Sequence, residues 1–146
     1  MRARKLKQIL TKNPYTRRVF LGVYPSCKVP VSKRKSYCFI SNTQSHEKTG
    51  KHWVVWFIKN DRVLFFDSFG RSPYNADFPH SFMDMAERFQ KCSYVAKPVQ
   101  HPSSAWCGLH CMHFIFMLAV GLSVDEFLKN YEKNDIVKLF NFIFSK

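Results

Sequence analysis

Hydrophobic and polar residues alternate along the chain with two different spacings, which predict a mixed α and β protein. Segments 53–58 and 63–66 are apolar on both faces, as buried central strands are. The polar residues 59–62 between them predict a hairpin turn. Shorter strands are predicted at 19–24 and 37–41. We therefore expect a sheet built around the hairpin.

Helical spacing appears at both ends of the sequence. A first helix at 3–12 ends before Asn13-Pro14, because the residue before a proline avoids the α region. Only a buried helix fits the long apolar run at 105–120. Further elements are predicted as helices at 81–91 and 123–131, an extended segment at 94–99, and a last helix with an apolar stripe of Ile136, Leu139, Phe140 and Ile143.

Length and composition favour one folded domain over residues 1–146. The chain has 46% hydrophobic and 16% aromatic residues, far more than a disordered chain carries. It contains no internal repeat or linker. It also has no apolar run near the ~20 residues that span a bilayer, and its first residues lack the apolar core of a signal peptide. We expect a protein that is neither membrane-spanning nor secreted by that route.

The cysteines favour a reducing compartment. There are five of them, an odd number, and no pair has CxxC spacing, which argues against a disulfide framework. They are Cys27, Cys38, Cys92, Cys107 and Cys111.

Charge is unevenly distributed, and the imbalance predicts a polyanionic partner. The formal net charge is +13, and the first acidic residue is Glu47. The basic residues before it are Arg2, Arg4, Lys5, Lys7, Lys12, Arg17, Arg18, Lys28, Lys33, Arg34 and Lys35. Such a block attracts phosphate backbones without reading sequence, so we expect DNA binding. Alternative interpretations are a solvated surface, a nuclear-import cluster, or a basic amphipathic helix at a membrane surface.

The hairpin brings a histidine and an acid together. With Lys59 opposite Arg62, or in the next tighter register, His52 and Asp67 share a face at one edge of the sheet, within about 4.5 to 8 Å at Cβ. A carboxylate there can orient an imidazole as a general base requires. The alternative is a structural hydrogen bond.

Cys107 is a candidate nucleophile at the start of the apolar helix. A helix N-terminus favours a thiolate and lowers the pKa of a cysteine placed there. Gly108 would let a substrate approach the backbone closely. Alternatively, Cys107 is a small core residue, which is the interpretation we favour for Cys111. A metal site of Cys107, His110, Cys111 and His113 is an alternative that the sequence does not favour, because it has no second ligand cluster.

Four motifs, in order, resemble the adenovirus maturation protease (adenain) family, which has relatives in related viruses and large DNA transposons. They are FLGVY at 20–24, GKHW at 50–53, FDSFG at 66–70 and QHPSSAWCGLHC at 100–111. The resemblance covers about residues 20–116. The order histidine, acid, cysteine separates this family from papain-like enzymes, in which the cysteine comes first.

The resemblance implies an α+β fold, with a central mixed sheet packed on a buried helix whose N-terminus bears the nucleophilic cysteine, as in adenain and the SUMO proteases. It implies a cysteine endopeptidase in which Cys107 attacks, His52 is the base and Asp67 orients it. Gln100 would complete the oxyanion hole, and Trp53 and Gly108 would line the substrate cleft. Adenain has Glu at the position of Asp67, whereas SUMO proteases use Asp.

Partners and location also follow from the resemblance. Substrates would be viral structural precursors cut beside glycine, in the virion and the host nucleus, by a monomer that needs no metal. DNA and a short basic viral peptide would be activators. The peptide would form a disulfide with Cys92, which we expect to be exposed between a helix ending at Lys91 and an extended segment. The alternatives are a deubiquitinating or deSUMOylating isopeptidase, and a non-enzymatic DNA-binding structural protein.

Overall fold

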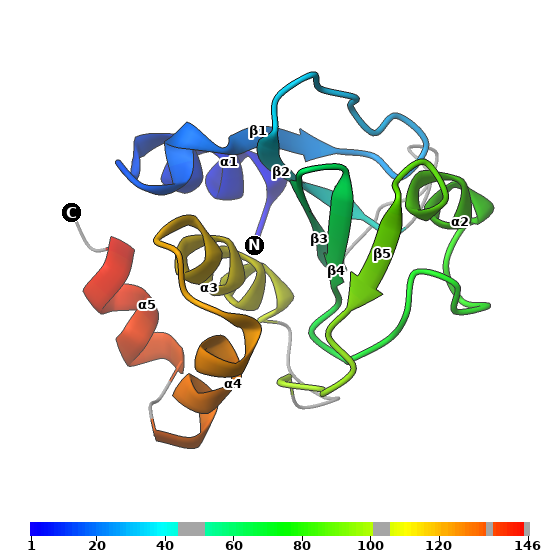
Figure 1. Cartoon of the computed structure of the whole chain (residues 1–146). Helices are drawn as coiled ribbons and strands as arrows, with labels where there is room; N and C mark the ends of the chain where they lie inside the picture. The colour runs from blue at the N-terminus through cyan, green and yellow to red at the C-terminus, as the bar shows by residue number, and fades with distance from the viewer. Residues whose placement is uncertain (44–51, 101–105, 134–135, 145–146) are drawn as a thin grey trace.

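The fold is a five-stranded mixed sheet with helices on both faces (Figure 1). The computed structural model describes residues 1–43, 52–100, 106–133 and 136–144. The strands are β1 (Phe20–Tyr24), β2 (Ser36–Asn42), β3 (Trp53–Lys59), β4 (Arg62–Phe66) and β5 (Lys91–Tyr94), in that spatial order. The two outer pairs are parallel and the inner pairs antiparallel. The α+β prediction is confirmed.

The helices divide unequally between the two faces. They are α1 (Ala3–Lys12), the short 3₁₀ helix η1 (Thr16–Arg18), α2 (His80–Ala86), α3 (Cys107–Ala119), α4 (Val124–Lys133) and α5 (Ile136–Phe144). One hydrophobic core contains residues of α1, α3, α4 and α5, and a second core on the opposite face contains residues of α2. No helix in the described ranges is long and apolar enough to cross a membrane.

The β3–β4 hairpin has the predicted register, with Lys59 opposite Arg62. Asn60 and Asp61 form its two-residue turn with positive φ values of 51° and 60°. Such a turn matches the twist of the flanking strands, and Asn and Asp tolerate this conformation. The turn therefore determines which residues of β3 and β4 lie opposite each other at the other end of the hairpin.

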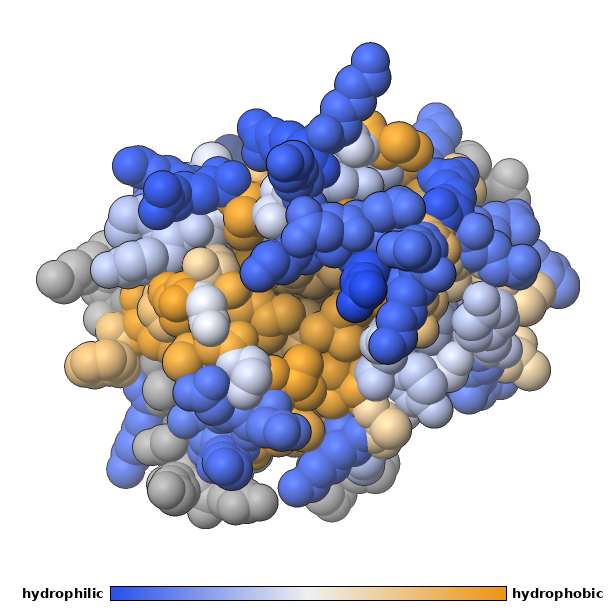
Figure 2. Space-filling view, in the orientation of Figure 1, coloured by the Kyte–Doolittle hydropathy of each residue, from blue (hydrophilic) through white to orange (hydrophobic). Residues whose placement is uncertain are grey.

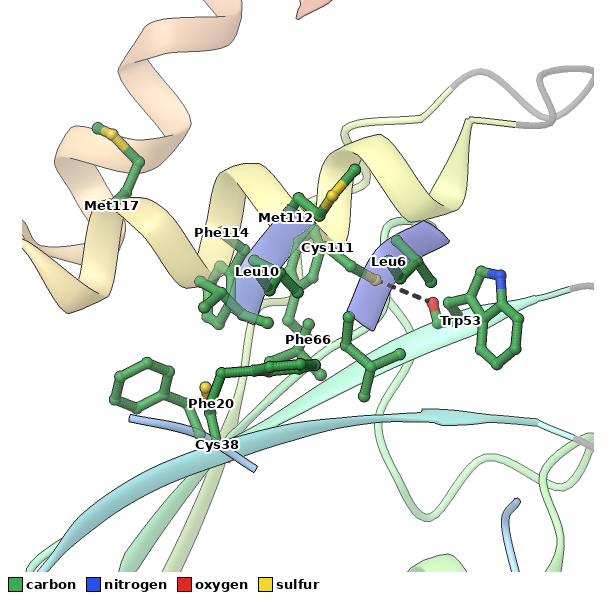
Figure 3. Close-up of a cluster of buried hydrophobic side chains, with 14 of the residues drawn as sticks. Leu6, Leu10, Phe20, Cys38, Trp53, Phe66, Cys111, Met112, Phe114 and Met117 are labelled. Carbon is green, nitrogen blue, oxygen red and sulfur yellow. Dashed lines mark hydrogen bonds between the residues drawn. The ribbon is translucent and has the colours of Figure 1, made fainter. Parts of the chain in front are cut away.

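Helix α3 is mostly buried and lies across β3 and β4 (Figure 3). The rings of Phe66 and Phe114 stack with centroids 4.5 Å apart. The Cys111 thiol donates a hydrogen bond to the Trp53 carbonyl oxygen at 3.3 Å, which ties the N-terminal part of α3 to the start of β3 (Figure 3). The N-terminus of α3 is thereby held at the sheet end where the hairpin strands begin and finish. The core assignment of Cys111 is confirmed.

The segment after α2 differs from the prediction. The helix ends at Ala86 instead of continuing to 91, and the strand begins at Lys91 instead of 94. The Gln90 backbone N–H donates to the Asp61 carbonyl at 2.9 Å, which starts the pairing with β4 in place of a further helical turn. Cys92 consequently lies half-buried within β5. The expectation that it sits exposed between a helix and a strand was wrong.

Candidate active site

His52 and Asp67 meet at the open end of the hairpin. His52 directly precedes β3, and Asp67 directly follows β4. His52 Nε2 is hydrogen-bonded to Asp67 Oδ1. The Asp67 side chain is fully buried, whereas 17% of the His52 side chain is exposed. The ring of Phe69 stacks on the imidazole with centroids 5.0 Å apart. The His52 ring is therefore held by a contact on its face and by the hydrogen bond at its Nε2.

Cys107 is the first residue of α3, and its thiol also makes a hydrogen bond with the His52 side chain. Cys107 is buried, with 4% of its surface exposed. The three predicted side chains therefore form a connected series, with His52 in the middle.

Electrostatics in this series favour separated charges. Burial by itself raises the pKa of Cys107, but hydrogen bonds with His52 and the Trp53 backbone and the charge of His52 bring it below the ordinary value. Burial also opposes the charge of His52, yet its bonds to Asp67 and Cys107 leave the His52 pKa raised. A thiolate beside an imidazolium is the reactive form of a cysteine nucleophile.

Arg71 is a site residue that sequence reasoning missed. Its Nε and its backbone N–H donate to Asp67 Oδ2 at 2.7 and 3.1 Å, and its Nη2 lies 3.4 Å from Oδ1. The guanidinium carbon lies over the rings of Phe78 and Phe69, 4.5 and 5.5 Å from their centroids. Burial raises the pKa of Asp67, but the bonds from His52 and Arg71 bring it below the usual value. Asp67 is therefore a carboxylate with partners on both oxygens.

The turn after β4 explains the glycine of the FDSFG motif. Gly70 has φ +77°, and its N–H donates to the Asp67 carbonyl at 2.8 Å. A Cβ at Gly70 would lie 2.6 Å from the Ala96 carbonyl oxygen and 2.9 Å from the Pro98 nitrogen. Only glycine satisfies both the conformation and the close approach. The turn thus brings residues 96–100 against the end of β4.

Gln100 is held at the same sheet end by Ser68, the neighbour of Asp67. The backbone N–H groups of Val99 and Gln100 donate to the Ser68 carbonyl at 2.8 and 3.0 Å. The Ser68 hydroxyl donates to Gln100 Oε1. Because Oε1 accepts this bond, Nε2 is the atom of the amide with protons to donate. Residues 101–105, between Gln100 and the start of α3, lie outside the described residues.

Trp53 and Gly108 contact the first residue of the chain. The Trp53 indole N–H donates to the Met1 carbonyl at 3.0 Å, and only 7% of Trp53 is exposed. A Cβ on Gly108 would lie 3.3 Å from both Leu6 and Met1. Close packing of α1 on α3 therefore accounts for the glycine, and a role for either residue in a substrate cleft stays a prediction.

The histidines of α3 have a different partner. His110 Nδ1 and His113 Nδ1 lie 2.9 and 3.2 Å from the Tyr131 hydroxyl, and Cys111 is bonded to Trp53. Within the described ranges, no three His, Cys, Asp or Glu residues are grouped so that they could hold a metal ion. The eleven basic residues named above are all exposed, from Arg2 to Lys35.

Comparison with known proteins identifies the family. The family model for the adenovirus endoprotease matches residues 20–137. The proteases of Bovine adenovirus 2 and Human adenovirus A serotype 12 are 33% and 32% identical over 109 and 111 residues, in each case 66% of this chain and 53% of the relative. The chain thus spans about half the length of these relatives.

A solved structure shares the fold. The ASFV pS273R protease superposes with a TM-score of 0.56 and 21% sequence identity, covering 75% of this chain and 44% of that one. At this identity the likeness concerns the fold alone. The match of the family model over most of the sequence shows the family: this chain belongs to the adenovirus endoprotease family.

Proposed function

We propose that this chain is a cysteine endopeptidase that cuts viral structural precursors. The observation that carries the proposal is the hydrogen-bonded series of Cys107, His52 and Asp67 at one end of the sheet. Membership of a protease family supports the same reaction class. We further propose that residues 1–146 act as one monomeric protease domain.

In the proposed mechanism, the Cys107 thiolate attacks the carbonyl carbon of the scissile peptide bond. The bond from sulfur to carbon forms as the carbonyl electrons move onto oxygen, and the Gln100 amide with the Cys107 backbone N–H would stabilise that oxyanion. Loss of one such donor typically costs about 2.7 to 4 kcal/mol of barrier. The His52 imidazolium then protonates the leaving amine, and His52 accepts a proton from the water that hydrolyses the acyl-enzyme. Asp67 keeps the imidazole oriented throughout.

The decisive test is cleavage of structural proteins encoded beside this gene by wild type, Cys107→Ala and His52→Ala. Each substitution is expected to abolish turnover, by about a thousandfold or more, because nucleophile and base act as one unit. Cys27→Ala is the matched control, since Cys27 is an exposed cysteine away from the series. Wild-type cleavage by Cys107→Ala would refute the assignment.

Substrate preference is proposed to be for small residues, chiefly glycine, at the cleavage site. A panel of precursor peptides with Gly, Ala or Leu before the cut, together with ubiquitin-like proteins ending in Gly-Gly, tests this preference. The expected order of kcat/KM is Gly above Ala above Leu. Preferential release of ubiquitin-like proteins would identify an isopeptidase instead.

An association with DNA, in the virion and the host nucleus, is proposed from the exposed basic residues of the first third of the chain. Phosphate contacts of this kind keep a protein on a packaged genome without sequence preference.

A viral activating peptide bonded to Cys92 is proposed from the family resemblance. Two thiols would lose two electrons and two protons to an oxidant such as oxidised glutathione as the disulfide forms. Burial raises the pKa of Cys92, so its exchange is expected to be slow at neutral pH. Mass spectrometry of wild type and Cys92→Ser after incubation with precursor peptides tests this. Full activity without any stimulating peptide would contradict it.

A further inference from the structure

A cavity of about 690 Å³ lies far from His52, where the β3–β4 hairpin turn meets the C-terminal end of α3. Its floor is apolar and comes from β3, β4, α3 and the start of α4. The floor residues are Phe57, Leu64, Leu118, Leu122 and Val124. All but Phe57 are only half-buried, so this surface keeps contact with water. Figure 2 shows an apolar area in the middle of the visible face of the molecule, bordered by hydrophilic residues.

Three cations on three adjacent strands line the same cavity. Lys59 of β3 pairs with Arg62 of β4, and Arg62 pairs with Lys91 of β5. Since side chains alternate along a strand, all three extend from the face that carries Phe57 and Leu64. Like charges directly opposite each other destabilise a sheet. Within the described residues none of the three forms an ion pair, and all three are exposed.

The end of α3 does not account for this charge. A helix C-terminus carries only about half a negative charge. Its last carbonyls already accept bonds from the chain that follows: Gly121 N–H donates to Leu118 and Leu122 N–H to Met117, both at 3.0 Å. The nearby acid Glu126 is engaged by Ser123, whose backbone N–H and hydroxyl donate to its carboxylate at 3.2 and 3.1 Å. Among the described residues, these three cations beside the apolar floor therefore have no ion-pair partner.

We propose that this cavity binds an acidic peptide segment that places one large apolar side chain on the floor and carboxylates against Lys59, Arg62 and Lys91. The volume lies within the range of about 300 to 1,000 Å³ typical of ligand sites. Duplex DNA would neutralise the three cations but would leave the apolar floor uncovered, because its outer surface is phosphate and sugar. A basic peptide with an apolar residue could cover the floor but would be repelled by the three cations. The site is separate from Cys107, so the proposal does not rest on the proposed protease activity.

Fluorescence anisotropy with defined peptides tests the ligand chemistry. The probe is fluorescein-labelled Gly-Glu-Asp-Phe-Glu-Asp-Gly, added to the full chain carrying Cys107→Ala so that no peptide is cut. Two competitors replace Phe by Ser, or all four acids by Lys, and a third is a 20-base-pair DNA duplex. The acidic Phe peptide is expected to bind about fivefold or more tightly than either altered peptide, and to weaken as salt rises.

Charge reversal locates the site. Lys59→Glu with Arg62→Glu is expected to weaken the acidic Phe peptide about tenfold, while Lys28→Glu with Lys33→Glu, which changes the net charge equally at exposed positions, changes affinity less than about twofold. Circular dichroism melts check that both double variants fold. Equal loss in the two double variants would overturn the proposal, as would equal affinity for the Phe and Ser peptides. A further contrary result is displacement of the probe by the DNA duplex from the Cys107→Ala chain but not from the same chain with Lys28→Glu and Lys33→Glu. That result would place the peptide on a DNA-binding surface at Lys28 and Lys33, and would also overturn the proposal.

Discussion

At the scale of single residues, the buried carboxylate of Asp67 has more partners than His52 alone. Oδ1 is bonded to His52, and Oδ2 accepts from the Arg71 guanidinium and backbone. A buried charge with an unmet oxygen is costly, so Arg71 stabilises the ionised form and fixes the rotation of the carboxylate. The same guanidinium is a positive charge close to the imidazolium, and it limits how strongly Asp67 can hold the His52 proton.

Replacing Arg71 by Gln is therefore expected to change the pH profile and not only the rate. Without the guanidinium, the pKa of Asp67 rises, and the pKa of His52 rises because a competing positive charge is removed. The alkaline limb of kcat/KM, measured with a fluorogenic peptide, should move to higher pH, and the maximum should fall about tenfold as orientation is lost. Arg71→Lys should restore the limb but only part of the rate. If the alkaline limb of Arg71→Gln coincides with that of wild type, this role of Arg71 is excluded. The same holds if Arg88→Gln, the control, shifts the limb equally.

Asp67→Asn tests the carboxylate itself. The amide oxygen can still accept from His52, so the ring keeps a partner but loses the negative charge that raises its pKa. Activity is expected to fall further than in Arg71→Gln but to stay measurable, unlike Cys107→Ala, because a thiolate and an imidazolium stabilise each other unaided. Progress curves at high enzyme concentration measure the remaining activity. Complete loss in a folded protein would show that the charge is essential.

At the scale of helices and strands, the sequence predicted those features that neighbouring residues determine. The C-terminal end of α1 follows from a proline, and the register of the β3–β4 hairpin follows from a two-residue turn. Strand β5 was misplaced because four residues with no alternation become a strand only by pairing with β4. Arg71 and Ser68 were missed for a similar reason. Their partners are set by a turn and by the close approach at Gly70, and neither leaves a periodic pattern.

The joint between α3 and α4 predicts a pH-dependent stability. His110 and His113 both meet the Tyr131 hydroxyl, and burial lowers the pKa of each from 6.5 to about 4. Because the pKa of each histidine is lower in the folded state, the unfolded state binds protons more readily, so the contribution of these histidines to stability is complete above pH 6.5 and is lost as the pH falls from 6.5 towards 4. The melting temperature should therefore fall across this range.

Substitution separates this joint from other titrating groups. His113→Phe keeps an aromatic ring in contact with Phe127, whose ring centroid lies 4.9 Å away, and should flatten the fall between pH 6.5 and 4. His80→Gln, at an exposed histidine, should leave the fall unchanged. His52 acts in the opposite sense, because its pKa is raised and its contribution is lost as the pH increases. A His113→Phe melting curve that parallels wild type would place the pH sensitivity elsewhere.

At the scale of the whole molecule, positive charge occurs in two settings that should be separable by experiment. The basic residues of the first third are exposed on α1, η1 and the loop between β1 and β2. Lys59, Arg62 and Lys91 instead surround an apolar floor at the hairpin end of the sheet. Phosphate contacts need only exposed charge, whereas an acidic peptide with an apolar anchor needs both features at one place.

Neutralising Arg17, Arg18, Lys33, Arg34 and Lys35 together is therefore expected to weaken DNA binding by the same factor on unrelated sequences, because phosphate contacts carry no base information. If all five contact phosphates, the slope of log K against log salt should fall by about 4.5 for duplex DNA. Anisotropy titrations from low to high salt measure both quantities. Lys59→Gln with Arg62→Gln is the control and should reduce the slope much less. An unchanged slope in the fivefold variant would move the DNA-binding surface away from these residues, and a larger loss in the control would place DNA at the hairpin cavity.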